Sequence, residues 1–122
     1  PVVATMSFDA GERSSFGVDG ATAARRLAEL GADVVGGNCA YGDGLVSAMA
    51  AASDATDRPI MCKPNAGLPR LVGGETLFDT TPAEFAQFAV RLKAVGVRHF
   101  GGCCGTTPEH VRQVKLAVLA DS

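Results

Sequence analysis

Three cysteines lie among glycines at points where apolar segments end. Cys39 closes the run 36–39, and Cys103 and Cys104 are adjacent within the run 101–105. Glycines permit backbone angles and close approaches that a side chain would block. A pair of thiols in such a turn adds little to a core but is well suited to hold a metal. Three thiolates give Zn²⁺ a site with an open fourth position, which is the catalytic arrangement rather than the closed structural one.

The cysteines also allow other interpretations. Each could be a small apolar core residue, the common fate of a free cysteine, and we expect this for Cys62, which lies inside an apolar segment. A closed zinc site could instead recruit His99 or Cys62. An iron–sulfur cluster requires a spaced thiol pattern that is absent. Disulfides of a secreted protein fit poorly because adjacent cysteines bond to each other only with strain. We therefore expect reduced thiols in a cytoplasmic protein.

Two asparagines and two glycines are candidates for substrate binding. Asn38 directly precedes a predicted metal ligand, and Asn65 lies in the run 63–69, which follows another apolar segment. Each asparagine either contacts the substrate or hydrogen-bonds a neighbouring loop or its own turn. Gly101 and Gly102 either present backbone N–H groups to a substrate carboxylate or only permit the turn.

Three further polar residues carry weaker signals. Asp9 follows the first apolar segment and is interpreted as an ordinary loop charge at the rim. Tyr41, the only tyrosine, is expected to pack against other side chains. His110 lies in the first turn of a predicted helix and is expected at the surface.

Hydrophobic patterning places these residues on alternating strands and helices. Short β-branched runs predict strands, and apolar residues at helical spacing predict helices. Asp19 and a Thr81–Glu84 capping box mark helix starts, whereas Gly31 and Gly96 mark helix ends. The predicted strands are residues 1–8, 32–37, 58–63 and 97–101; the predicted helices are 21–30, 43–55, 82–95 and 108–120; residues 65–74 are a predicted loop.

The strand–helix order repeats four times at roughly thirty residues per unit, which is typical of a parallel α/β fold. Four units are half of a (βα)₈ barrel, which takes about 250 residues. We expect a parallel (βα)₄ sheet, half of a TIM barrel, completed by a second copy or by a missing N-terminal half. A half-barrel exposes two strand edges and an apolar inner face. Val111, Val114 and Val118 of the last helix are expected to face inward, and a four-stranded flavodoxin-like sheet is the alternative fold.

The place of the cysteines in such a fold supports the metal hypothesis. In a parallel barrel, functional groups lie at the C-terminal ends of the strands. Cys39 ends the second predicted strand and Cys103 and Cys104 end the fourth. All three therefore fall on the same rim.

Composition argues against several classes of function. With 122 residues the chain is one domain or less. Its formal net charge of −2 gives no strong field for nucleic acid. No apolar run reaches the length of about 18 residues that a membrane span needs, and no signal peptide is visible. The chain begins with Pro1 rather than Met, which indicates that it was cut from something longer.

Three motifs, taken in order, resemble the homocysteine S-methyltransferase family. They are Gly-x-Asn-Cys at 36–39, Pro-Asn-Ala-Gly-Leu-Pro at 64–69 and Gly-Gly-Cys-Cys-Gly-Thr-Thr-Pro at 101–108. Within the family, the chain is similar to the homocysteine-binding part of cobalamin-dependent methionine synthase. The resemblance runs from about residue 1 to about residue 120 and matches the last four strands of eight. Residues 1–122 are therefore expected to be the C-terminal half-barrel of such a domain.

The resemblance implies zinc ligation by Cys39, Cys103 and Cys104. It further implies that homocysteine takes the fourth position as a thiolate, because a metal-bound thiol is deprotonated at neutral pH. That thiolate would attack an electrophilic methyl group and give methionine. The donor stays open between a methylcorrinoid or methyltetrahydrofolate in a larger protein and the S-methylmethionine or betaine used by other relatives.

The resemblance also shows what is missing. In the family, an Asp-Gly motif near the first strand and acidic residues on early strands help hold the amino acid part of homocysteine, and nothing in this chain matches them. A zinc-binding half-barrel without activity of its own, which assembles with a partner chain or a second copy, is therefore the alternative function. A different small thiol as the acceptor is a third hypothesis.

Overall fold

The segments richest in β-branched and apolar residues form one parallel sheet in the computed structural model, which describes residues 1–9 and 11–120. The strand order is β1-β2-β3-β6. The strands are β1 (Val3–Ser7), β2 (Val34–Asn38), β3 (Ile60–Lys63) and β6 (Val97–Phe100). The prediction of a parallel α/β arrangement is confirmed, with strand ends that shift by one or two residues.

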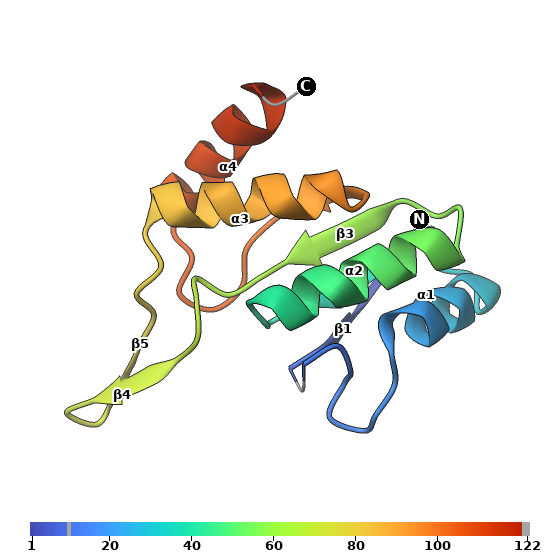
Figure 1. Cartoon of the computed structure of the whole chain (residues 1–122), viewed down its shortest axis with the longest axis horizontal. Coiled ribbons are helices and arrows are strands. Elements are labelled where there is room, and N and C mark those ends of the chain that lie inside the picture. The colour runs from blue at the N-terminus through green and yellow to red at the C-terminus, as the bar shows by residue number, and fades with distance from the viewer. Residues whose placement is uncertain (10, 121–122) are drawn as a thin grey trace.

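Four helices alternate with these strands; the first three pack on the sheet, and the last packs on the third helix (Figure 1). The helix starts follow the predicted caps. The side chain of Asp19 accepts a hydrogen bond from the Thr22 N–H at 2.8 Å, and Thr81 and Glu84 form a reciprocal capping box. Within residues 1–9 and 11–120, none of the helices has the length and apolar character needed to cross a membrane. The helices are α1 (Gly20–Glu29), α2 (Asp43–Ala55), α3 (Pro82–Ala94) and α4 (Pro108–Ala120).

The core lies between the sheet and these helices. Val35 of β2, Ile60 of β3 and Val97 of β6 are paired across the sheet and fully buried. Leu45 and Met49 of α2 belong to the same cluster. A second, smaller cluster joins α3 to α4 through Phe85, Ala89 and Val114.

The opposite face of the sheet carries polar side chains that are only partly buried. Thr5, Asn38 and Lys63 occupy neighbouring register positions on it. In a closed (βα)₈ barrel this face would point to the interior. Among the described residues, β1 and β6 each pair along one side only.

The burial of the valines of α4 differs in part from the expected pattern. Val114 is buried as predicted, but Val111 is 46 % exposed, so the prediction that it faces inward is wrong for that residue. The helix packs on α3 and flanks β6, which is the last strand of the sheet. Val111 lines an open groove between α4 and β6, which leaves its side chain partly exposed.

A β-hairpin replaces part of the predicted loop at 65–74. β4 (Arg70–Val72) and β5 (Glu75–Leu77) pair antiparallel and project away from the main sheet (Figure 1). Gly73 and Gly74 connect them with φ of +57° and +84°. Two positive φ values at a two-residue connection are the signature of a type I′ hairpin turn. The Gly-Gly pair was therefore a strand-pairing signal that the loop prediction overlooked.

Candidate metal centre

Cys39 leaves the end of β2 in an unusual backbone conformation. Its φ is +52°, the one positive value at a non-glycine position in the described chain. Such a residue persists only when its surroundings hold it. The Cys39 N–H donates to the Lys63 carbonyl at 3.1 Å, and the Ser7 hydroxyl donates to the Cys39 carbonyl at 3.4 Å. These contacts hold the Cys39 backbone in the turn that follows β2.

Cys103 and Cys104 lie in the turn between β6 and α4. The Cys103 N–H donates to the Pro64 carbonyl at 2.9 Å, and the Thr106 hydroxyl donates to the Cys103 carbonyl at 2.7 Å. Gly105 follows with φ +79°. The glycine-bracketed turn predicted from the sequence thus exists, and it exposes Cys104 while Cys103 is half-buried.

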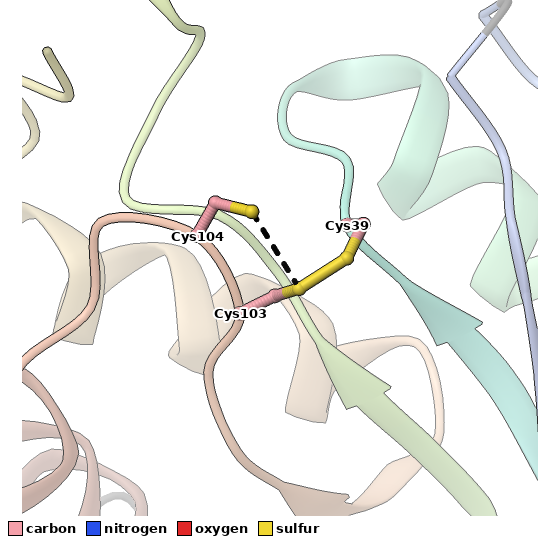
Figure 2. Close-up of side chains that lie close together, drawn as sticks. All are labelled: Cys39, Cys103 and Cys104. Atoms are coloured by element: carbon pink, nitrogen blue, oxygen red, sulfur yellow. Dashed lines mark hydrogen bonds between the residues drawn. A yellow bond between two sulfur atoms is a disulfide. The ribbon is translucent and has the colours of Figure 1, made fainter. Parts of the chain in front are cut away.

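The three sulfur atoms converge at the C-terminal rim of the sheet, all within 4.8 Å of one another (Figure 2). The Sγ atoms of Cys103 and Cys104 are 4.0 Å apart. Tetrahedral zinc with Zn–S bonds of about 2.3 Å separates its sulfur ligands by roughly 3.8 Å. The separation of the adjacent pair and the all-sulfur donor set therefore both suit zinc.

Cys39 and Cys103 are joined by a disulfide, with Cα atoms 5.5 Å apart. This differs from the prediction of reduced thiols throughout. The reason is the same proximity that favours a metal, because two sulfur atoms held this close can also bond to each other. A disulfide removes two thiolates, so the bond and metal ligation by both sulfurs exclude one another.

The other candidate ligands lie apart from this cluster. Cys62 is fully buried in β3, as predicted, and burial raises the pKa of its thiol to about 12. It stays protonated at neutral pH and is inert toward metal. His99 lies on β6, before the turn that carries Cys103. Neither belongs to a group of metal-ligating side chains within the described part of the chain.

The candidate substrate residues surround the cluster in different ways. Asn38 lies at the end of β2, where its side-chain oxygen accepts from the Thr5 hydroxyl at 2.7 Å. Asn65 is 8 % exposed, and its side-chain oxygen accepts from the Cys104 N–H at 3.1 Å. The Gly101 N–H donates to the Cys62 carbonyl at 3.1 Å, so it is already engaged within the sheet.

Gly102 is needed for a close approach. A Cβ atom there would collide with the side chain of Thr106. This favours the interpretation that the glycine permits the turn. The sequence analysis did not identify Thr106, Ser7 or Lys63 as part of the site. The hydroxyls of Thr106 and Ser7 donate to the carbonyls of Cys103 and Cys39, and the Lys63 side chain lies beside Gly101. Their only sequence signal was a position near a cysteine or at the end of a strand.

His110 is buried, so the prediction that it lies at the surface is wrong. Its Nε2 is 2.8 Å from the Thr80 carbonyl, and its Nδ1 accepts from the Thr107 N–H at 3.2 Å. Phe85 packs edge-on against the imidazole. The ring therefore ties the start of α4 to the segment before α3, which explains why a first-turn histidine is enclosed.

A cleft of about 360 Å³ opens beside Cys39. Asp9 and Asn65 line it, and Asp9 accepts a hydrogen bond from the Ser15 hydroxyl at 2.9 Å. Tyr41 also lines the cleft and stacks on Phe88 with ring centroids 4.3 Å apart, so it packs as expected.

Comparison with known proteins agrees with this geometry. Residues 1–118 match the family described as homocysteine S-methyltransferase. The methionine synthase of Mycobacterium leprae is 40 % identical over 91 residues, covering 73 % of this chain and 8 % of that protein. The methionine synthase of Mycobacterium tuberculosis is 34 % identical over 120 residues, covering 97 % of this chain and 10 % of that protein. The chain thus spans about a tenth of these relatives.

Solved structures of the homocysteine methyltransferase MmuM from Escherichia coli share the fold. Its apo form matches with a TM-score of 0.68 at 24 % identity, over 93 % of this chain and 39 % of that chain. Its metallated form matches with a TM-score of 0.67 at 25 % identity, over 92 % and 34 %. Its oxidized form matches with a TM-score of 0.65 at 27 % identity, over 90 % and 34 %. With the family match extending over nearly the whole chain, the protein belongs to the homocysteine S-methyltransferase family.

Proposed function

We propose that this chain supplies the metal-binding half of a barrel that transfers a methyl group to the thiol of homocysteine, forming methionine. The observation that carries the proposal is the convergence of three cysteine sulfurs within 4.8 Å at the rim of the sheet. Family membership supports homocysteine as the acceptor. The methionine synthase relatives favour a methylcorrinoid as the donor, as in a larger enzyme.

Cys39, Cys103 and Cys104 would hold Zn²⁺ as three thiolates. The metal would supply Lewis acidity that keeps a substrate thiol deprotonated at neutral pH. A thiolate substrate needs no further general base, so the remaining task of the protein is to align sulfur and methyl group, which is worth several kcal/mol. Cys104 faces solvent, which leaves the approach to the cluster open from the rim.

The remaining substrate contacts are proposed along the open face of the sheet and the adjoining turns. Asn38 lies on that face, Gly101 and Gly102 lead from it into the cysteine turn, and Asn65 lines the cleft beside Cys39. The Lys63 ammonium also lies on this face and would suit the substrate carboxylate. Three thiolates require reducing conditions, so we place the protein in a reducing compartment such as the cytoplasm.

A second half-barrel is the proposed partner. The unpaired sides of β1 and β6 are ready to accept further strands, and an apolar groove of about 380 Å³ runs along β6 and α4 through Phe100, Val114 and Leu119. The MmuM structures extend well beyond the part that this chain matches. A second copy of the chain is the other source of that half.

A metal-binding half-barrel without activity of its own remains the second candidate function. Because β1 and β6 are the end strands of an open sheet, the inner face is not enclosed. A substrate bound on that face would be exposed to water, which favours this second function. Methylation of homocysteine by the purified chain, with and without a second polypeptide, separates the two functions. Competition between homocysteine and other small thiols identifies the acceptor.

Elemental analysis of the reduced, metal-replete chain tests the metal site directly. We expect about one zinc per chain, loss of that zinc in Cys103→Ala, and retention in the matched control Cys62→Ala, whose sulfur is buried away from the cluster. No zinc in the folded wild-type chain would contradict an autonomous site. Equal loss in both variants would point to misfolding rather than to ligation.

A further inference from the structure

His110 is a buried histidine whose two ring nitrogens both have hydrogen-bond partners. It lies in the first turn of α4 and is 7 % exposed. Its Nε2 atom is 2.8 Å from the Thr80 carbonyl, and its Nδ1 atom accepts from the Thr107 N–H at 3.2 Å. A carbonyl oxygen only accepts hydrogen bonds, and an amide N–H only donates. These partners therefore select the neutral imidazole with its proton on Nε2, which donates to Thr80.

The contact with Thr80 leads on to the metal centre. The Thr80 N–H donates to the Ala66 carbonyl at 3.1 Å, and the Ala66 N–H donates to the Cys104 carbonyl at 2.9 Å. A row of hydrogen bonds thus runs from the imidazole of His110 to the backbone of a proposed zinc ligand. Each of these contacts joins segments that are remote in sequence, so the row fixes the spacing between the cysteine turn and its two neighbouring segments.

The contact with Thr107 closes this row into a circuit. Thr107 comes three residues after Cys104, in the same turn between β6 and α4. The path from Cys104 through Ala66, Thr80 and His110 therefore returns to the turn from which it began. The other hydrogen-bonding groups along this path belong to the main chain. The imidazole is thus the part of the circuit that a substitution can remove.

The surroundings leave the imidazole little room to move. Phe85 of α3 packs edge-on against it, with ring centroids 5.4 Å apart. The backbone also approaches closely along the circuit, because a Cβ atom at Gly67 would collide with the side chain of Thr80. Close-packed interiors transmit small displacements to their neighbours. A change in the contacts of His110 should therefore reach the cysteine turn.

We propose that His110 is a positioning residue for the metal centre, which closes the circuit that holds the Cys104 backbone in its turn. The inference rests on the proposed zinc site. His110 acts through Thr80 and Thr107 and lies outside the group of three sulfur atoms. Removal of a group that orients a metal ligand typically lowers metal affinity by about 10- to 100-fold. Because His110 acts through intervening residues, we expect the lower end of that range.

The test compares three variants of the reduced chain. His110→Phe keeps an aromatic ring in the site but removes both ring hydrogen bonds. His110→Gln keeps an N–H donor for the Thr80 carbonyl, and His99→Phe is the control, because His99 is exposed on β6. Zinc affinity is measured by competition with a chromophoric chelator. The thiolate-to-metal absorption band of the Co²⁺-substituted chain reports how many sulfurs are bound. If His110→Phe does not fold, His110→Leu takes its place.

We expect zinc affinity to fall by about 10-fold in His110→Phe, with a weaker Co²⁺–thiolate band. His110→Gln should keep most of the affinity, and His99→Phe should behave as wild type. A role in packing alone would give the reverse order for the two His110 variants, because phenylalanine fills the space of the imidazole better than glutamine does. That reverse order, wild-type affinity in His110→Phe, or an equal loss in His99→Phe would overturn the proposal.

Hydrogen exchange of the Ala66 amide keeps this proposal apart from the proposed function. In the reduced chain without metal, His110→Phe should make this amide exchange faster, whereas His110→Gln and His99→Phe should not. Faster exchange at Thr107 alone would show a local role at the helix start and would overturn the proposal. A wild-type chain that binds no zinc would contradict the proposed function, and exchange at Ala66 would still decide the role of His110.

Discussion

Replacing Gly105 with alanine tests whether the turn after Cys104 requires a residue without a side chain. Gly105 has φ +79°, a conformation that costs an L-residue roughly 1–2 kcal/mol. The added Cβ would also collide with the Cβ and ring of Phe78. Because the Cβ of Phe78 is fixed to its backbone, rotation of the ring cannot relieve the collision. Overpacking of this kind adds about 1–3 kcal/mol, so we expect a total loss of about 2–5 kcal/mol.

Gly73→Ala is the matched control for this substitution. Gly73 also has a positive φ, +57°, but an added Cβ would meet no atom within 4 Å. It should lose only the backbone contribution of about 1–2 kcal/mol. Denaturant unfolding of the reduced chains gives both free energies of unfolding, and thermal unfolding should separate the variants by roughly 4 °C per kcal/mol. Zinc affinity should fall in Gly105→Ala alone, because the Cys104 backbone must shift with its neighbour.

The refuting result is specific. If Gly105→Ala lost no more stability than Gly73→Ala, the contact with Phe78 would not constrain the turn. If it lost stability but kept full zinc affinity, the position of Cys104 would be independent of the residue that follows it. Either outcome would contradict the view that close backbone approach, rather than turn flexibility, explains this glycine.

Three further predictions concern the thiols and the helix caps. A thiol reagent should label one cysteine in the oxidised native chain, three after reduction, and the fourth, Cys62, only after unfolding, because Cys62 is buried with a raised pKa; early labelling of Cys62 would contradict its burial. One equivalent of peroxide per reduced, metal-loaded chain should form one disulfide and two molecules of water and release the zinc, as measured with a chromogenic chelator. A dithiol should reverse this reaction. Zinc retained in fully oxidised chain would show that the disulfide and metal binding do not exclude one another. Glu84→Gln should lower the melting temperature at pH 7, because the Thr81 backbone N–H and hydroxyl hold the pKa of the Glu84 carboxylate below its ordinary 4.5. This stabilisation is complete above the unfolded pKa of 4.5 and is lost as pH falls through the lower folded pKa, so the two melting temperatures should converge as pH falls through that range. A difference that stays constant with pH would contradict the carboxylate's role.

The sequence predicted the elements whose signals are local. α2 and α4 begin and end at the predicted residues, because apolar residues recur at helical spacing in both and proline opens the first turn of α4. Asp19 and the Thr81–Glu84 box cap the helices as expected. The convergence of the three cysteines also followed from local information, since parallel strands place their C-terminal ends on one rim.

The misses have long-range causes. His110 is buried because Thr80 and Phe85, remote in sequence, enclose it. Val111 is exposed because the groove that it lines between α4 and β6 is open. The contact between Asn65 and the Cys104 N–H depends on the order in which strands pair, which periodicity does not report. Such contacts depend on the order of the strands in the sheet. Residue types near a motif can therefore suggest that a contact exists but cannot identify the partner residue.

The described contacts indicate that the two halves of the proposed barrel contribute differently to metal binding and to substrate binding. The described hydrogen bonds to the three cysteines come chiefly from residues 63–66 and Thr106. These contacts tie the two cysteine-bearing turns to each other, so we expect the ligand geometry to form without the second half-barrel. Among the described residues, the open face of the sheet offers Asn38 and Lys63 but no carboxylate, and Asp9 in the cleft beside Cys39 already accepts a hydrogen bond from the Ser15 hydroxyl. On this argument the chain should bind zinc by itself and should bind homocysteine tightly only when the other half contributes an acidic group, so metal binding and substrate binding should separate experimentally in the isolated chain.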